Sequence, residues 1–341
     1  MKRVLVIGNG FDLDMGFDTT YETFARSYFK ENIYEYSKMF LFLRKRYEEC
    51  PNKNWFNFED EICRYVSSLG DDVSEKDVAA DRTYYNALCH DLMCSSQILA
   101  FSVPYVNTPE YIRENGGNRN EVNPAYRLHG KPQSIANRML DFISINPTYF
   151  DSIISFNYTD FGNLLLLRVA GNVNYNQQDI EFFKTKIMNR VHFVHLRKEE
   201  SGRSSSVLGI NDEIHIISDY EFVRKRNQAI ISERECVISD ISSADELIIF
   251  GHSLGEADKE YFRQFFRNLY NQNDIESDDK DVTFITYDDN RLIINNLNKI
   301  AGYNVIFNHN FVNHTHFIYT KVEESHICYM DLVNHLQDSS L

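Results

Sequence analysis

The chain of 341 residues is strongly acidic, with 50 Asp and Glu residues against 35 Lys and Arg and a formal net charge of −15. This charge disfavours a general DNA- or RNA-binding surface, so we expect a small ligand rather than nucleic acid. With 43% hydrophobic and 14% aromatic residues, the chain has ample material for a packed globular core. The six cysteines include no Cys-x-x-Cys pair, which disfavours a zinc ribbon or a disulfide framework, and we expect no metal.

The N-terminal stretch does not have the pattern of a signal peptide, because two basic residues lead directly into a short apolar segment. The longest apolar runs, such as residues 164–167 and 247–250, are far shorter than the roughly 20 residues that a membrane-spanning helix needs. We therefore expect a cytoplasmic protein with no membrane partner.

A short strand followed by a glycine turn opens the chain. Residues 4–7 are Val-Leu-Val-Ile, which is typical of a strand buried on both faces, and Gly8 and Gly10 follow at once. Such a turn lets main-chain N–H groups approach a ligand, so a nucleotide site is the leading hypothesis. The alternative is that the glycines only turn the chain out of the sheet, because the third glycine of the usual fingerprint is missing. Asp12 and Asp14 would repel a phosphate, so we expect them to face a sugar, cap N–H groups or bind solvent.

A helical region follows this first unit. Thr19 and Glu22 have the spacing of a capping box and predict the start of a helix. Helical periodicity then continues, and we expect residues 33–145 to form a helical insertion. Within it, Trp55 stands beside the acids of residues 59–61. We favour the interpretation that these acids start a helix at the positive end of its dipole, and the alternative is a lid that contributes an acid to a cleft.

The second and third predicted strands each end near a residue that is suited to catalysis. Asn157 follows the apolar run after Asp151, where its amide can hydrogen-bond a ribose or position a water. Alternatively, Asn157 and Asp160 only cap the next helix. His195 lies at the end of the strand predicted for residues 191–196, where an imidazole that titrates near neutrality can act as a general base. The alternative is a half-buried packing histidine.

A second strand with a glycine turn, at residues 246–251, precedes another predicted helix. Gly251, Ser253 and Gly255 match the G-x-S-x-G pattern of a nucleophile elbow, so we considered a serine hydrolase. Its triad needs a later acid and then a histidine, and nothing singles these out beyond Asp288 and His309, His314 or His316.

Two more strands, predicted at residues 282–287 and 304–307, bring the number to six. The alternation of strands with helical stretches predicts an α/β fold with a doubly wound, mostly parallel sheet. We expect one domain over residues 1–341 that carries the helical insertion.

The motifs at these turns resemble those of AbiH-type abortive-infection proteins of bacterial phage defence. The resemblance covers most of the chain and rests on Gly8-Asn-Gly10-Phe-Asp12-Leu, on Ser155-Phe-Asn157-Tyr158-Thr159, and on the run from Gly251 to Asp258. These proteins are similar in turn to the wider sirtuin-like group, whose nucleotide fold begins with a glycine turn and a further glycine at the spacing of Gly16. The resemblance implies a sirtuin-like Rossmann variant.

The resemblance also implies NAD as ligand or substrate. Asn157 and His195 would be the catalytic residues at the nicotinamide ribose. The cofactor-binding residues would be Gly8, Asn9, Gly10, Phe11, Asp12, Gly16, Tyr158, Gly251, His252, Ser253 and Leu254. The chain departs from the pattern at Leu196, where a glycine normally follows the histidine. It also lacks the Cys-x-x-Cys zinc module of sirtuin deacylases, which points away from acyl-lysine substrates and towards hydrolysis of the nucleotide.

The implied function is that of an antiphage abortive-infection effector, a NAD glycohydrolase that depletes NAD and so halts the infected cell. The alternative is a non-catalytic module that senses a nucleotide and signals to a partner, with a homo-oligomer or a phage-derived trigger involved. A third class, an RNA- or DNA-cleaving toxin, would need metal-binding carboxylates or a basic groove.

Overall fold

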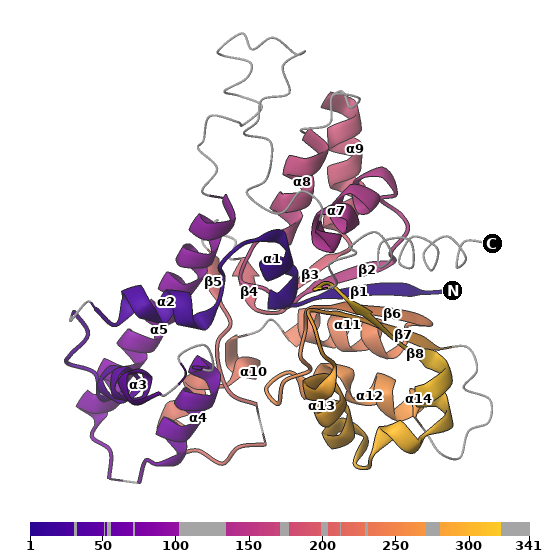
Figure 1. Ribbon diagram of the computed structural model, residues 1–341. Helices are drawn as coiled ribbons and strands as arrows, with labels where there is room; N and C mark the ends of the chain where they lie inside the picture. The colour runs from indigo at the N-terminus through magenta and orange to yellow at the C-terminus, as the bar shows by residue number, and fades with distance from the viewer. Residues whose placement is uncertain are drawn as a thin grey trace.

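The structure, a computed structural model, describes the chain outside residues 31–32, 51, 53–55, 71, 102–133, 171–176, 199–203, 212, 229–230, 271–279 and 322–341, so Trp55 lies outside the described residues. Its centre is a six-stranded sheet in the order β3-β2-β1-β6-β7-β8, in which every neighbouring pair is parallel (Figure 1). The predicted doubly wound α/β fold is confirmed. The strands are β1 (Arg3–Ile7), β2 (Ser152–Ser155), β3 (Val191–Phe193), β6 (Glu246–Phe250), β7 (Asp281–Thr286) and β8 (Thr315–Tyr319).

The strand order reverses direction at the centre of the sheet. Numbered along the chain, the six strands follow the order 3-2-1-4-5-6, which is that of dinucleotide-binding Rossmann sheets. β1 pairs with β2 on one side and with β6 on the other, and Ile7 is aligned with both Ser155 and Phe250. Open parallel sheets bind ligands beyond the carboxyl ends of their strands at such a switch point. The ends of β1 and β6 are therefore the place to look for a site.

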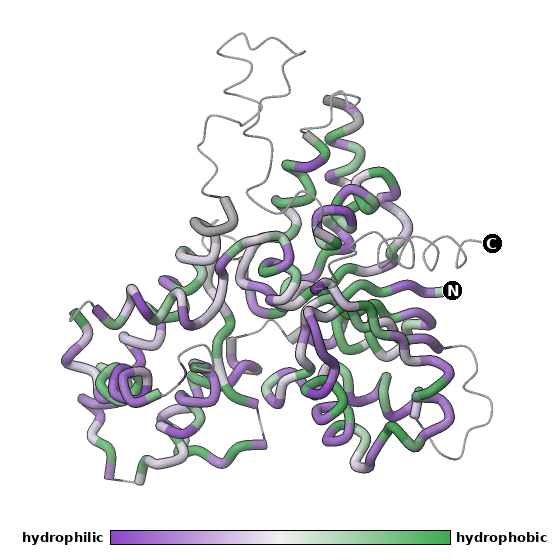
Figure 2. The backbone as a smooth tube through the Cα atoms, viewed as in Figure 1, coloured by the Kyte–Doolittle hydropathy of each residue, from purple (hydrophilic) through white to green (hydrophobic). Residues whose placement is uncertain are grey.

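Helices cover both faces of the sheet (Figure 1). Leu5 and Ile7 of β1 point into one apolar core and Val4 and Val6 into the other, which is why this strand needs four consecutive aliphatic residues. Figure 2 shows the hydrophobic residues concentrated along the strands. The first core is covered by α1 (Asn9–Met15), α7 (Ile135–Ile145), α8 (Phe161–Ala170) and α9 (Gln177–Met188). The second is covered by α11 (Ile231–Ser242), α12 (Lys259–Leu269) and α13 (Arg291–Ala301).

A third core lies beside the sheet in a helical unit, which we define as α2–α5 together with residues 208–223. Aromatic rings fill it, and Phe29 alone contacts five other rings. α7 falls within the expected insertion of residues 33–145, yet it packs on the sheet against α1 and α8. The elements of the unit are α2 (Tyr21–Tyr28), α3 (Lys38–Glu49), α4 (Phe58–Ser67), α5 (Glu75–Phe101) and the 3-10 helix η4 (Ser218–Val223).

The prediction of a strand at residues 304–307 is wrong. This stretch is a short 3-10 helix, η5 (Val305–Phe307), and the Asn304 side chain accepts a hydrogen bond from Ile306 N at its start. Only Val305 of the three is buried, whereas Phe307 is 84% exposed. A short apolar run does not by itself distinguish a strand from a helical turn. The sixth strand is instead β8, which pairs with β7 at the edge of the sheet.

The third predicted strand is divided in two. Only β3 joins the main sheet, and β4 (Leu196–Lys198) pairs antiparallel with β5 (Ser204–Ser206) in a separate ribbon. His195 therefore stands in the link between the two sheets. The remaining short helices are α10 (Lys225–Gln228) and α14 (His309–His314). Within the described part of the chain, no helix combines the length and the apolarity that a membrane span requires.

Candidate functional site

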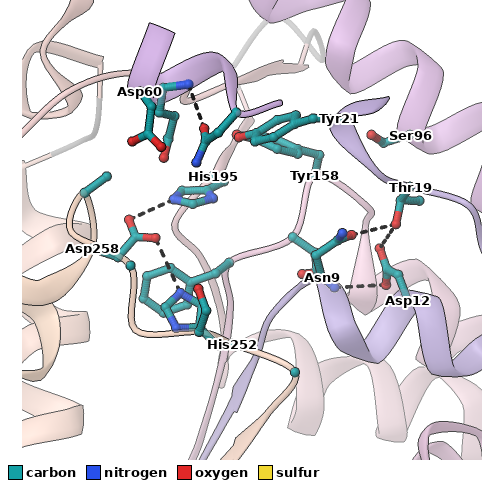
Figure 3. A pocket seen from close by; sticks show the side chains of 18 of the residues that line it. Asn9, Asp12, Thr19, Tyr21, Asp60, Ser96, Tyr158, His195, His252 and Asp258 are labelled. Carbon is teal, nitrogen blue, oxygen red and sulfur yellow. Dashed lines mark hydrogen bonds and ion pairs between the residues drawn. The ribbon is translucent and has the colours of Figure 1, made fainter. Parts of the chain in front are cut away.

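A cavity of about 330 Å³ lies at the switch point between β1 and β6 (Figure 3). The turns after β1, β2 and β6 form one side, and α2, α4 and α5 of the helical unit contribute the other. The residues that line it are Asn9, Asp12, Thr19, Tyr21, Asn57, Glu59, Asp60, Ser96, Phe156, Asn157, Tyr158, His195, Gly251, His252, Ser253, Gly255, Glu256, Ala257 and Asp258.

The glycines at this switch point hold two backbone turns against each other. Gly8 N donates to Phe250 O at 2.8 Å and Gly10 N donates to Gly251 O at 2.9 Å, so both N–H groups are engaged within the protein. A Cβ atom on Gly10 would lie 2.6 Å from the Cα atom of Gly251, which itself has a φ of +65°. Neither Gly8 nor Gly10 lines the cavity, whereas Gly251 does. The glycine pattern therefore serves the close approach of the turns after β1 and β6.

We expect Gly10→Ala to destabilise the protein by at least about 1–3 kcal/mol, because the added methyl group would push against backbone that cannot rotate away. The measurement is urea unfolding followed by circular dichroism. Gly255→Ala is the matched control, since a Cβ atom there would meet its nearest neighbour at 3.8 Å, an ordinary contact. Equal stability of the two variants would show that the turns do not require this close contact.

Asp12 forms the centre of a buried polar cluster on one side of the cavity (Figure 3). Its carboxylate accepts hydrogen bonds from Asn157 Nδ2 and from Thr159 Oγ1, both at 2.9 Å. Thr19 Oγ1 lies 3.4 Å from the same carboxylate and 2.7 Å from Asn9 Oδ1. Burial raises the pKa of Asp12 from 3.8 to about 7, although these hydrogen bonds act in the opposite direction. Asp12 can therefore gain or lose a proton near neutral pH.

The raised pKa of Asp12 predicts a pH-dependent stability. Between pH 3.8 and about 7 the folded protein keeps a proton that the unfolded chain has released, so stability falls as the pH rises through this window. The slope should be at most about 1.4 kcal/mol per pH unit and should vanish above the folded pKa. Urea unfolding from pH 5 to 8 measures it, and Asp12→Asn should lose this part of the slope. Parallel curves for the two proteins would contradict the assignment.

Asn157 has an unused acceptor beside this carboxylate. Its Nδ2 atom is bound to Asp12, but its buried Oδ1 atom has no hydrogen-bond partner among the described residues. A buried amide oxygen without a partner costs free energy, so a ligand hydroxyl or N–H group is a natural partner for it. The alternative role as a helix cap belongs to Asp160 alone, which accepts from Asn163 N at the start of α8. Asp14 likewise accepts from Ala136 N at the start of α7.

A network of buried charges lies on the other side of the cavity. Lys225 Nζ lies 2.7 Å from Asp258 Oδ1, 2.8 Å from Glu59 Oε1 and 3.1 Å from His195 Nε2. His195 Nε2 is in turn 3.1 Å from Asp258 Oδ1. Figure 3 shows Asp258 between His195 and His252, whose Nε2 atom is 3.4 Å from Asp258 Oδ2. The helical unit supplies Glu59, so this network joins that unit to the sheet.

Mutual pairing keeps Asp258 and Lys225 charged. Burial by itself would raise the pKa of Asp258, but Lys225 and His195 hold that pKa well below its usual value. Burial likewise opposes the charge of Lys225, and Asp258 and Glu59 outweigh it, so the pKa of Lys225 is raised. His252 Nδ1 accepts from Leu254 N at 3.1 Å, which assigns the proton to Nε2 on the side of Asp258.

Aromatic rings form the wall between the two polar groups. The Tyr158 ring stacks on the imidazole of His195, with 5.5 Å between centroids and 25° between planes. Tyr158 OH and Tyr21 OH lie 2.8 Å apart, so the wall continues from the sheet into the helical unit. Phe156 packs edge-on against His195 and also contacts His252. A flat ring would find both aromatic and carboxylate neighbours in this cavity.

The structure brings most of the predicted site residues together, and a few lie elsewhere. Asn9, Asp12, Asn157, Tyr158, His195, Gly251, His252 and Ser253 all line the cavity. Phe11 instead packs between Phe161 and Phe250 in the core, and Gly16 ends α1 in a left-handed conformation. Leu254 is buried with a φ of +56° and does not line the cavity. The residues proposed for a serine-hydrolase triad, Asp288, His309, His314 and His316, are likewise absent from the described lining.

Sequence reasoning missed Lys225 and left Glu59 as the less favoured alternative. Glu59 lies in the first turn of α4, where its N–H group donates to the side chain of the N-cap Asn57, and it also lines the cavity, so this acid both stands at the helix start and reaches the cavity. Lys225 gave no signal, because it is one cation in a short basic run whose acidic partners lie far away in the sequence. Only a basic residue that stood beside a predicted site residue in the sequence, without an acidic neighbour, could have indicated such a role, and Lys225 does not stand there.

Comparison with curated proteins gave no match, and comparison with solved structures gave none either. The family model described as bacteriophage abortive infection AbiH matches residues 4–277. This range contains all of β1 except Arg3, together with β6, the helical unit and every residue that lines the cavity. The chain therefore belongs to the bacteriophage abortive infection family AbiH.

Proposed function

We propose that this AbiH protein is an antiphage effector that binds NAD in the cytoplasm and hydrolyses its bond between nicotinamide and ribose. The depletion of NAD would then stop the infected cell. Support comes first from the position of the cavity, which lies at the switch point of a sheet with the dinucleotide-binding strand order. Its volume of about 330 Å³ is in the range of small-molecule sites.

The charge of the lining is the observation that carries the proposal. Carboxyl groups approach the cavity from the sheet and from the helical unit, and no Lys or Arg is among its described lining residues. Such a field repels phosphates and favours a cation. The nicotinamide ring of NAD is a pyridinium cation, and the ribose becomes oxocarbenium-like as this ring leaves. The lining carboxyl groups are Asp12, Glu59, Asp60, Glu256 and Asp258.

The same residues define how the nicotinamide riboside end would bind. The aromatic wall of Tyr158 and Phe156 would contact the flat ring, and Asn157 Oδ1 would accept a hydrogen bond from a ribose hydroxyl. The pyrophosphate would remain outside the acidic cavity, because the N–H groups of Gly8 and Gly10 are already engaged.

Hydrolysis would break the bond between ribose C1′ and the pyridinium nitrogen, and the electron pair would leave with neutral nicotinamide. Water would then add to C1′ and lose a proton. Among the lining residues that are chemically able to accept this proton, we consider Asp12, with its pKa of about 7, and His195. The carboxylates would stabilise the positive charge that develops on the sugar.

The test is nicotinamide release from NAD by the purified protein, with Asn157→Ala as the informative variant. If Asn157 orients the reacting ribose, this change should lower turnover about 10- to 100-fold, equivalent to a lost hydrogen bond of ~1–3 kcal/mol, and should weaken NAD binding much less. Binding is measured by calorimetry. Asn163→Ala is the control, because that exposed residue on α8 lies away from the lining.

A second candidate function is nucleotide sensing without turnover. The specific observation in its favour is that Tyr21 and Glu59 bring the helical unit directly into the wall of the cavity. A bound ligand would therefore contact both units and would be able to alter how they pack. Saturable NAD binding without nicotinamide release, together with an Asn157→Ala protein that no longer binds, would favour sensing over hydrolysis.

A further inference from the structure

A cluster of His192, Cys236 and Asp240 lies outside the cavity. His192 is on β3, and Cys236 and Asp240 are both on α11. One ligand atom from each residue lies within 4.8 Å of the other two. His192 Nε2 and Asp240 Oδ2 are 3.6 Å apart, with only 22% and 18% of the two side chains exposed. The three side chains therefore form a compact group of sulfur, nitrogen and oxygen donors.

The fold fixes this group in place. Cys236 and Asp240 are four residues apart and so share one face of α11. The same helix packs on the sheet through Val237 and Ile241, which belong to the core on that side. His192 is on the edge strand of the sheet, which pairs with β2. Core packing thus sets the distance between the strand ligand and the two helix ligands, independently of any ion.

We propose that His192, Cys236 and Asp240 form a transition-metal site of the zinc class, which is separate from the nucleotide cavity. A thiolate and an imidazole select zinc-like ions over magnesium or calcium, which prefer oxygen ligands. In a tetrahedral site with bonds of about 2.0 Å, nitrogen and oxygen ligands lie about 3.3 Å apart, close to the observed separation. The thiolate and the carboxylate balance the charge of a divalent ion, and a water completes its coordination.

Lys2 orients the carboxylate of Asp240 towards the site. Lys2 Nζ donates to Asp240 Oδ1 at 2.8 Å and to Ser243 Oγ at the same distance. Because Oδ1 is held in this way, Oδ2 is the oxygen that faces His192. Ligating carboxylates are commonly fixed by such outer contacts. The positive charge of Lys2 weakens the attraction for a cation, so we expect a site of moderate affinity.

Metal binding at this position would stabilise the edge of the sheet at β3. An ion bound by all three side chains would cross-link β3 to α11. Because an ion that binds only the folded protein stabilises it, the melting temperature should rise with metal concentration. His195 follows β3 closely, so the same ion would also steady the segment that brings His195 to the cavity.

The experiment titrates Co²⁺ and Zn²⁺ into the full chain after treatment with a chelator. We expect one equivalent of Co²⁺ to bind with a thiolate-to-cobalt charge-transfer band in the near ultraviolet, and Zn²⁺ to displace it and raise the melting temperature. Cys236→Ser should abolish the band and weaken Zn²⁺ binding by more than about 100-fold, since even outer contacts cost 10- to 100-fold. His192→Ala should weaken binding as well. Cys50→Ser, which changes the cysteine at the C-terminal end of α3, is the matched control.

Two results would overturn the proposal. One is a charge-transfer band that persists in Cys236→Ser, and the other is the absence of stoichiometric Co²⁺ binding to the unaltered chain. Cys94→Ser tests whether the metal binds on α5 instead, because Cys94 and His90 also face each other there. Loss of the band in that variant, with the band retained in Cys236→Ser, would place the metal on α5. Circular dichroism of each variant separates lost ligands from lost folding.

Discussion

Replacing Lys225 with methionine should destabilise the protein by about 3–5 kcal/mol. The ammonium group of Lys225 is the cation shared by Asp258 and Glu59, and all three side chains are largely buried. Methionine has a similar length but no charge, so two carboxylates would be left close together without their counterion. Taking charges out of water is tolerated only when they are paired, which is why the loss should be far larger than for a surface ion pair.

Urea unfolding of Lys225→Met measures this loss, and Lys38→Met is the matched control. Lys38 also pairs with a carboxylate, that of Asp77, but its side chain is 62% exposed. The control should therefore cost no more than about 1 kcal/mol. Adding Glu59→Gln to Lys225→Met should restore part of the lost stability, because it removes one uncompensated charge. A loss for Lys225→Met as small as that of Lys38→Met would contradict the buried ion-pair network.

The local patterns in the sequence were sufficient to predict the parallel sheet except for its edge strand β8. The aliphatic run before Gly8 and the one before Gly251 are each buried on both faces, and both precede a glycine turn. Asn157 and His195 were each predicted near the end of a strand, the family resemblance implied that they share one site, and both line the cavity. Edge strands are harder to predict, since their side chains are only half buried. The sixth strand was predicted at residues 304–307 instead of at β8, most of whose side chains are only half buried.

The contacts between distant segments were not predictable from these patterns. The reason that Gly10 must be glycine is the backbone of Gly251, which lies far away in the sequence. Similarly, Lys225 acquires a role only because the helical unit brings Glu59 to Asp258. No periodicity or spacing encodes how the helical unit packs against the sheet. The sequence therefore predicted which strand ends carry polar residues, but not which charges pair across the cavity.

His195→Ala should lower nicotinamide release about 10²–10⁴-fold if the imidazole accepts the proton of the attacking water. The structure complicates this role, because Nε2 is already 3.1 Å from both Asp258 and Lys225, so proton transfer would have to use Nδ1 or break one of these contacts. A general base works only in its unprotonated form, so turnover should also fall at low pH. Steady-state kinetics over a range of pH, with the melting temperature of each variant, are the measurements.

His195→Gln separates proton transfer from packing, because the alanine variant also removes the ring that stacks on Tyr158. A glutamine amide can still hydrogen-bond Asp258, but it cannot take up a proton. If His195 is the base, both variants should lose turnover alike, whereas a positioning role would leave the glutamine variant largely active. Asp12→Asn supplies the remaining comparison, since burial raises the pKa of this lining carboxyl group to about 7. An inactive Asp12→Asn beside an active His195→Gln would assign the proton to Asp12, and full activity in both would contradict general-base catalysis by either residue.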